Sequence, residues 1–244
     1  AQDITRYGMD WDGKPHLADF LEELCKLDFH WIRLHYLYPE WIDDRLIDVI
    51  AREDKILKYL DIPLQHCNDK ILKKMNRRGD KKYLCALLDK LRERIPGLVL
   101  RTSIIAGLPG EGEEEFDELC DFLREQKLLR AGVFPYSPEE GTRAAKMERV
   151  DSDEAARRAE RIVDIQSEII DAWNDERQGD VMEVLCEGFD GQSMLFVGRS
   201  YAESPDIDGR IYFSAPRDVA AGEFVPVRIT GAMDGELTGE LAEE

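Results

Sequence analysis

Stretches rich in β-branched and aromatic residues alternate with amphipathic stretches along the first 140 residues, and this alternation restricts the fold more than any other feature. Helical spacing of apolar residues is present in residues 17–27, 42–53, 69–76, 81–95 and 113–126. Strand-like runs lie among them, at residues 31–37, 59–66, 98–107 and 130–137. Strands that alternate with helices of this length pair in parallel through right-handed crossovers. The pattern predicts an α/β fold with four parallel strands, preceded at residues 1–3 by the end of a further strand.

Polar side chains follow the ends of these strands. They are Gln2, Asp3, His35, Tyr36, Gln65, His66 and Ser137. In a parallel α/β barrel, the rim at the carboxyl ends of the strands is where sites are built. Strand ends are also polar where they simply meet water, but polar residues at several ends together favour a site at this rim.

The pattern changes after a long predicted helix at residues 151–177. Asp151 and Glu154 have the spacing of a capping box at its start. Short alternating runs broken by Gly, Pro and Asp follow, and they predict a small all-β module with five strands in a barrel. We therefore expect two domains, residues 1–178 and residues 179–244, with the boundary near Gln178.

The chain is strongly acidic, with 52 acidic and 33 basic side chains and a net charge of −19. This charge disfavours non-specific contact with nucleic acid and favours a basic partner. Residues 179–244 alone carry fourteen acidic side chains against four arginines, a net charge of −10. Since no apolar run approaches the length of a membrane span, no membrane partner is expected.

The five cysteines are widely spaced, at Cys25, Cys67, Cys85, Cys120 and Cys186. This spacing excludes a CxxC site and a dense disulfide scaffold, and the odd count indicates a reducing cytoplasm. We expect these cysteines to be small buried hydrophobic residues. Cys67 is the exception, because it follows a strand end and is expected to face a pocket.

The segment "GLPGEGEE" (107–114) joins the strand at 98–107 to the next helix. It is not a phosphate-binding loop, because no Lys-Ser or Lys-Thr follows the glycines and the acidic residues Glu111 and Glu113–Glu115 would repel an anion. Acidic residues at a helix N-terminus are explained by the helix dipole. The glycines allow a flat, uncharged group to approach the backbone, with Ile105 against it. A purine ring with a zwitterionic tail fits such a loop better than a triphosphate.

Four segments carry a family resemblance, and together they extend over most of the chain. They are "DIPLQHCNDKILKKMNRRG" (61–79), "RTSIIAGLPGEGEEEFDEL" (101–119), "VFPYSPEEGTRAA" (133–145) and "GRSYAESPDIDGRIYF" (198–213). In this order they resemble the radical S-adenosylmethionine methylthiotransferases. The first residues, "AQDITRYG", and the "PLQH" segment resemble the RimO-type branch, which modifies an aspartate of a small-subunit ribosomal protein.

The resemblance implies a partial radical-SAM barrel of TIM-like type followed by a TRAM domain, which is a small OB-like barrel. It also implies S-adenosylmethionine and two 4Fe-4S clusters as cofactors, one of them held by a CxxxCxxC motif. This sequence contains no such motif, and its cysteines have the wrong spacing to replace it. We therefore expect no metal ligands in this chain and the cluster cysteines upstream of Ala1.

The resemblance also assigns residues to the cofactor. Gln2 and Asp3 correspond to positions near the methionine amino group, and Gln65 and His66 to positions near the ribose or the methionine. The adenine side comprises Arg101, Ser103, Ile105, Gly107, Pro109 and Gly110, together with the backbone of Phe134, Pro135, Tyr136 and Ser137. Arg101 could alternatively be a salt-bridge partner inside the barrel.

The implied reaction adds a methylthio group to the β-carbon of an aspartate, this chain being the C-terminal part of the enzyme. A radical made from S-adenosylmethionine removes the hydrogen, and sulfur is delivered from the second cluster. The acidic second domain would attract a basic ribosomal protein, and nucleic acid is not expected as the direct substrate. Two alternatives stay open: a tRNA adenosine methylthiotransferase, and a non-catalytic binding protein that lacks the clusters.

Overall fold

The computed structural model describes residues 2–242. It divides into two compact units, residues 1–166 and residues 167–244, and the division lies inside helix α7, Ser152–Glu176. The domain boundary expected near Gln178 lies further along the chain and stays a prediction.

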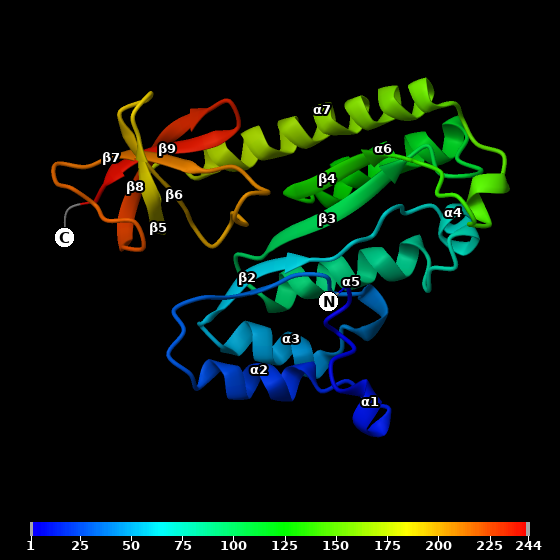
Figure 1. Cartoon of the computed structure of the whole chain (residues 1–244), viewed down its shortest axis with the longest axis horizontal. Helices are drawn as coiled ribbons and strands as arrows, with labels where there is room; N and C mark the ends of the chain where they lie inside the picture. The colour runs from blue at the N-terminus through cyan, green and yellow to red at the C-terminus, as the bar shows by residue number, and fades with distance from the viewer. Residues whose placement is uncertain (1, 243–244) are drawn as a thin grey trace. The chain divides into compact units, whose positions relative to one another are not determined.

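The first unit contains a sheet of four parallel strands in the order β1-β2-β3-β4 (Figure 1). The strands are β1 Ile32–Leu34, β2 Ile56–Asp61, β3 Val99–Ala106 and β4 Arg130–Pro135. This arrangement confirms the predicted α/β class and the four parallel strands.

Helices connect and flank these strands. The α-helices are α1 Met9–Asp12, α2 Leu17–Cys25, α3 Asp44–Arg52, α4 Asp69–Lys74, α5 Lys81–Arg94 and α6 Glu113–Gln126, and the 3₁₀ turns are η1 Pro39–Trp41 and η2 Ala144–Lys146. Asp43, Asn68 and Asp80 cap α3, α4 and α5, because each side chain accepts a hydrogen bond from a first-turn N–H. Asp151 caps α7 in the same way, accepting the N–H of Glu154 at 2.8 Å.

Strand β2 lies earlier in the chain than its sequence pattern predicts, because it ends at Asp61 rather than continuing to residue 66. Pro63 has no N–H to donate to a strand ladder. The hydroxyl of Thr102 accepts the N–H of Leu64 at 3.1 Å, and the chain rejoins β3 only at an isolated bridge between Gln65 and Ile104. Gln65 therefore still lies beside β3, although it is outside the regular strand.

The strand end expected at residues 1–3 is not present in the described residues. Gln2 and Asp3 have no strand pairing, and Ala1 lies outside the described residues. The segment instead meets the end of β1, since the N–H of Ile4 donates to the carbonyl of Tyr36 at 3.1 Å.

The second unit contains a closed five-stranded barrel in the order β5-β6-β7-β9-β8. Its strands are β5 Val181–Asp190, β6 Leu195–Arg199, β7 Ile211–Ser214, β8 Phe224–Met233 and β9 Glu236–Leu241. Alternate residues of β8, including Val225, Val227 and Ile229, point into a core that also contains Phe213 and Leu237. The predicted five-stranded barrel is confirmed. Among the described helices, none combines the length and apolarity that a membrane span requires.

Candidate functional site

One face of the sheet in the first unit is partly open at its carboxyl-end half. Arg101, Ser103 and Ile105 of β3 are each partly exposed, whereas Thr102, Ile104 and Ala106 between them are buried. Because side chains alternate along a strand, the first three share one face. The β4 partners in register with Ser103 and Ile105 are Gly132 and Phe134. This face therefore presents Ser103, Ile105 and Phe134 side by side.

Arg101 forms an ion pair on this face. Its Nη1 lies 2.9 Å from Oδ1 of Asp61, which is in register with it on β2 and is only 1% exposed. His35 and the N–H of Tyr36 contact the other oxygen of Asp61, at 3.5 and 3.3 Å. Burial alone would raise the pKa of Asp61, but His35, Arg101 and the Tyr36 N–H outweigh it and hold the pKa below its ordinary value. Arg101 thus takes the alternative role of a salt-bridge partner, and Asp61 is a site residue that sequence reasoning missed.

The segment Phe134–Ser137 lies at the end of the edge strand β4. The Phe134 side chain is 53% exposed, and Pro135 and Ser137 are also exposed. The N–H of Tyr136 continues the pairing with β3, donating to the carbonyl of Ala106 at 2.8 Å. A hollow of about 480 Å³ adjoins this segment and is lined by Tyr136, Pro138 and residues 147–152. This part of the predicted site is open to a ligand.

The glycine loop is shaped by contacts inside the protein. Gly107 has φ +81°, and a β-carbon on it would lie 2.6 Å from the β-carbon of Ala155 in α7. Gly110 has φ +83°, and its N–H donates to the carbonyl of Glu148 at 3.2 Å. Gly107, Leu108 and Pro109 are buried, and only Gly110 is exposed. The two glycines are therefore required by backbone conformation, and at Gly107 also by packing.

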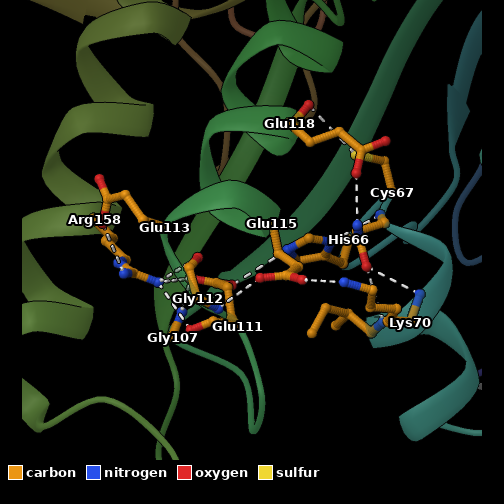
Figure 2. Close-up of polar contacts among 12 residues, drawn as sticks. His66, Cys67, Lys70, Gly107, Glu111, Gly112, Glu113, Glu115, Glu118 and Arg158 are labelled. Carbon is orange, nitrogen blue, oxygen red and sulfur yellow. Dashed lines mark hydrogen bonds and ion pairs between the residues drawn. The ribbon is translucent and has the colours of Figure 1, made fainter.

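The buried side chain of Glu111 binds the backbone of the glycine loop (Figure 2). Its Oε1 accepts hydrogen bonds from the N–H of Gly107 at 2.9 Å and from Nη1 of Arg158 at 2.8 Å. Its Oε2 faces Nε2 of His66 at 3.3 Å, although these two atoms do not form an aligned hydrogen bond. Burial alone would raise the pKa of Glu111, but His66, Arg158 and the Gly107 N–H hold it below its ordinary value. Sequence reasoning counted Glu111 among the acidic residues that would repel an anion and missed this role.

The acidic residues after Glu111 belong to the start of helix α6. Glu115 accepts the N–H of the N-cap residue Gly112 at 3.0 Å, which is one half of a capping box, and it also pairs with Lys70 at 2.9 Å. These contacts agree with the prediction that the acidic residues stabilise a helix N-terminus.

Asp3 carries a buried oxygen with no partner. Its Oδ1 accepts the N–H of Thr5 at 2.9 Å, but its Oδ2 is buried and has no hydrogen bond to any residue between Gln2 and Ala242. A buried carboxylate oxygen of this kind is costly unless a donor satisfies it. The atom is therefore a candidate acceptor for a cationic ligand group.

Tyr36 and Gln65 have left-handed backbones, with φ of 61° and 67°. Each lies just beyond the end of a strand, and non-glycine residues rarely adopt this conformation. The Gln65 side chain accepts from Nε of Arg77 at 3.3 Å. Strained residues of this kind cluster at functional sites, which favours a site at this rim.

The predicted residues thus fall into two groups. Those with exposed or partly exposed surface are Gln2, Asp3, Gln65, Arg101, Ser103, Ile105, Gly110, Phe134, Pro135, Tyr136 and Ser137. His66, Gly107 and Pro109 are buried, so direct contact of these three with a ligand stays a prediction.

The expectation that Cys67 faces a pocket is wrong, because its side chain has no exposed surface. The Cys67 thiol instead lies 3.8 Å from the carbonyl oxygen of Glu118 on helix α6. Burial raises the pKa of this thiol. Cys67 is thus a small buried residue. Cys25, Cys120 and Cys186 are buried as expected, whereas Cys85 is only partly buried, so the expectation is wrong for Cys85.

Comparison with known proteins finds two family models. The model of the radical SAM superfamily matches residues 7–123, and the model of the TRAM domain matches residues 179–242. The second match falls on the five-stranded barrel.

Curated relatives match along the whole chain. The ribosomal protein uS12 methylthiotransferase RimO of Symbiobacterium thermophilum is 46% identical over all of this chain and 51% of its own length. The RimO protein of Pelotomaculum thermopropionicum is 48% identical over 98% of this chain and 55% of its own length. The chain thus spans about half the length of the curated relatives it matches.

Among solved structures, the coproporphyrinogen III oxidase HemN of Escherichia coli, a radical SAM enzyme, superposes with a TM-score of 0.52 at 21% identity. The match covers 64% of this chain and 39% of that one, and it supports the fold alone. With both family models and relatives that match nearly every residue, the chain belongs to the radical S-adenosylmethionine methylthiotransferase family, in its RimO branch.

Proposed function

We propose that the protein to which this chain belongs is a methylthiotransferase that modifies the β-carbon of an aspartate in ribosomal protein uS12. The observation that carries this proposal is the identity of 46 to 48% between this chain and RimO proteins over nearly its whole length. A ribosomal substrate places the protein in the cytoplasm.

Two features of the first unit fit S-adenosylmethionine. The unpartnered Oδ2 of Asp3 is an acceptor suited to the ammonium group of the methionine moiety. Ile105 and Phe134 are in register on adjacent strands and offer an apolar surface to a purine ring. Tyr136 and Ser137 lie beyond Phe134, where their backbone could pair with the edge of the adenine.

In this proposal S-adenosylmethionine, bound with a reduced iron–sulfur cluster, supplies one-electron chemistry that can activate a C–H bond. The residues of this chain bind and orient it. Asp3 would hold the ammonium group, and Ile105 with Phe134 would hold the adenine. His66, Gly107 and Pro109 would shape the site through their neighbours, since they are buried. The ligands of both clusters would belong to the remainder of the full-length protein.

The acidic residues 179–244 support a protein substrate over tRNA. Their net charge of −10 would attract a basic ribosomal protein and repel phosphates. Asp206, Asp218 and Asp234 contribute exposed carboxylates to this charge. We propose that the barrel of residues 181–241 is the docking surface for uS12.

Titration of S-adenosylmethionine into the full-length, cluster-loaded protein tests the binding site. Asp3→Asn should weaken binding by about tenfold, the effect of losing one charge-assisted hydrogen bond. Asp10→Asn is the matched control, because Asp10 is an exposed carboxylate in the short helix α1. Equal affinities in wild type and Asp3→Asn would contradict the assignment.

Binding of purified uS12 and of tRNA to the same protein tests the partner. We expect uS12 to bind more tightly, with an affinity that falls as salt rises and falls again when Asp206, Asp218 and Asp234 are changed to Asn. Preferential binding of tRNA would overturn the proposed substrate.

A further inference from the structure

The buried carboxylate of Glu111 joins three segments that are distant in the sequence. It contacts His66, which follows β2, Gly107 at the end of β3, and Arg158 in α7. The side chains of His66 and Glu111 have no exposed surface, and that of Arg158 is 6% exposed. Figure 2 shows Arg158 reaching the loop from one side and His66 approaching it from the other.

Arg158 is bound to the loop at several points. Besides the Glu111 carboxylate, its Nη1 lies 3.2 Å from the carbonyl oxygen of Glu111 and 3.3 Å from that of Gly112. Its Nε and Nη2 pair with Glu154 and Glu113, at 3.0 and 3.2 Å. The guanidinium therefore fixes both the side chain and the backbone at the end of the glycine loop.

The tautomer of His66 follows from its neighbours. Its Nδ1 accepts the N–H of Asn68 at 2.9 Å, so in the neutral ring the proton lies on Nε2, which faces Glu111. The distance from this nitrogen to the Glu111 carboxylate, 3.3 Å, is longer than the contacts of Glu111 with Arg158 and Gly107, at 2.8 and 2.9 Å.

The backbone N–H of Gly107 is satisfied by the Glu111 side chain and not by a strand or helix partner. The left-handed backbone of Gly107 and Gly110 takes the loop out of regular pairing, and packing against Ala155 restrains it in addition. Ile105, the residue that we assign to the adenine, lies two positions before Gly107. A change in the path of Gly107 would therefore move the exposed end of the loop, Gly110, relative to Ile105.

We propose that Glu111 is a positioning residue, which with Arg158 and His66 holds residues 107–110 in the path that a bound adenosyl group requires. This inference rests on the proposed function for the identity of the ligand. The positioning itself is a property of the chain and is measurable without ligand.

The experiment compares the wild-type chain with Glu111→Gln and with Glu118→Gln. The glutamine retains the shape of Glu111 but removes the charge that Arg158 pairs with. Glu118 is the matched control, because it is a glutamate of α6 that accepts from Asn68 and pairs with Lys81 without contacting the loop. Amide hydrogen exchange of peptides covering residues 104–112 reports the loop, and titration of S-adenosylmethionine into the full-length, cluster-loaded protein reports the site.

In Glu111→Gln we expect loop exchange to rise by about tenfold and affinity for S-adenosylmethionine to fall by about as much, with β5 of the barrel unchanged. Glu118→Gln should leave both readouts at wild-type values. Arg158→Lys, which keeps the charge but not the planar fork, should shift both readouts in the same direction by less.

Wild-type loop exchange in Glu111→Gln, or an equal change in Glu118→Gln, would overturn the positioning role. Faster loop exchange with unchanged affinity would overturn the link to the ligand. Failure of the full-length, cluster-loaded protein to bind S-adenosylmethionine would instead contradict the proposed function, and loop exchange would still decide the role of Glu111. If Glu111→Gln does not fold, the same comparison is made with Arg158→Lys.

Discussion

Gly107 and Ala155 approach so closely that a β-carbon added to residue 107 would lie 2.6 Å from the β-carbon of Ala155. This contact packs the glycine loop against the start of α7, close to the ion pair of Glu111 and Arg158. The loop is thus placed by steric fit as well as by charge.

Gly107→Ala should destabilise the chain more than Gly141→Ala. Both glycines have φ +81°, but a β-carbon on Gly141 would meet nothing within 4 Å. The left-handed backbone costs about 1 kcal/mol for alanine at either position, and the clash with Ala155 adds about 1–3 kcal/mol. Urea unfolding measures the difference in stability. Equal losses of stability in the two variants would show that α7 shifts at Ala155 without cost.

The buried pair of Asp61 and Arg101 should make stability depend on pH. The pKa of Asp61 is lowered in the folded chain, because His35 and Arg101 outweigh the effect of burial. A lowered pKa contributes stability above the unfolded value of about 4, and this contribution is lost as the pH falls further.

Asp61→Asn isolates this contribution. At pH 7 the variant should be less stable by about 3 kcal/mol, because it removes the buried carboxylate charge that Arg101 and His35 contact. The difference in free energy of unfolding between wild type and variant should become smaller as the pH falls from 5 toward 3. Glu111 also has a lowered pKa, but it is present in both proteins and does not affect this difference. Urea unfolding measures this difference across the pH range. A difference that does not change with pH would contradict the proposed contribution of Asp61.

The fold could be predicted from the sequence because its signals are local. Helical spacing and β-branched runs identified the four parallel strands, and turn residues identified the five-stranded barrel. The end of β2 was missed because it depends on Thr102, which is distant in the sequence. The hydroxyl of Thr102 accepts the N–H of Leu64, the residue after Pro63.

The site was predicted less completely for the same reason. Ile105 and Phe134 were assigned to the adenine through the family resemblance, and the structure places them in register on adjacent strands. Glu111 was counted among the acidic residues that would repel an anion, because only its contact with Arg158, 47 residues away, shows that it is buried. Asp61 was missed because its partners His35 and Arg101 lie on two other segments.

Thr102→Val tests the irregular end of β2. The valine keeps the shape of the side chain but leaves the N–H of Leu64 buried without an acceptor, which costs about 1–3 kcal/mol. Thr230→Val is the control, because Thr230 is exposed in the barrel. This substitution should change the stability by less than about 0.5 kcal/mol. Chemical denaturation of both variants would contradict the assignment if their stabilities were the same.

Alkylation of the native chain should modify Cys85 first. Cys85 is half-buried, whereas Cys67 and Cys120 have no exposed surface. Burial raises the pKa of all three thiols, so each is less reactive than a free cysteine, and the two enclosed ones should react only when the chain opens. Mass spectrometry of peptides after a timed iodoacetamide pulse measures the order of labelling.

Cys85→Ser should remove the fast phase and leave the slow labelling of Cys67 and Cys120 unchanged. Labelling of Cys67 as fast as that of Cys85 would contradict this order. It would show that reagent reaches the Cys67 thiol, which contacts the backbone of Glu118.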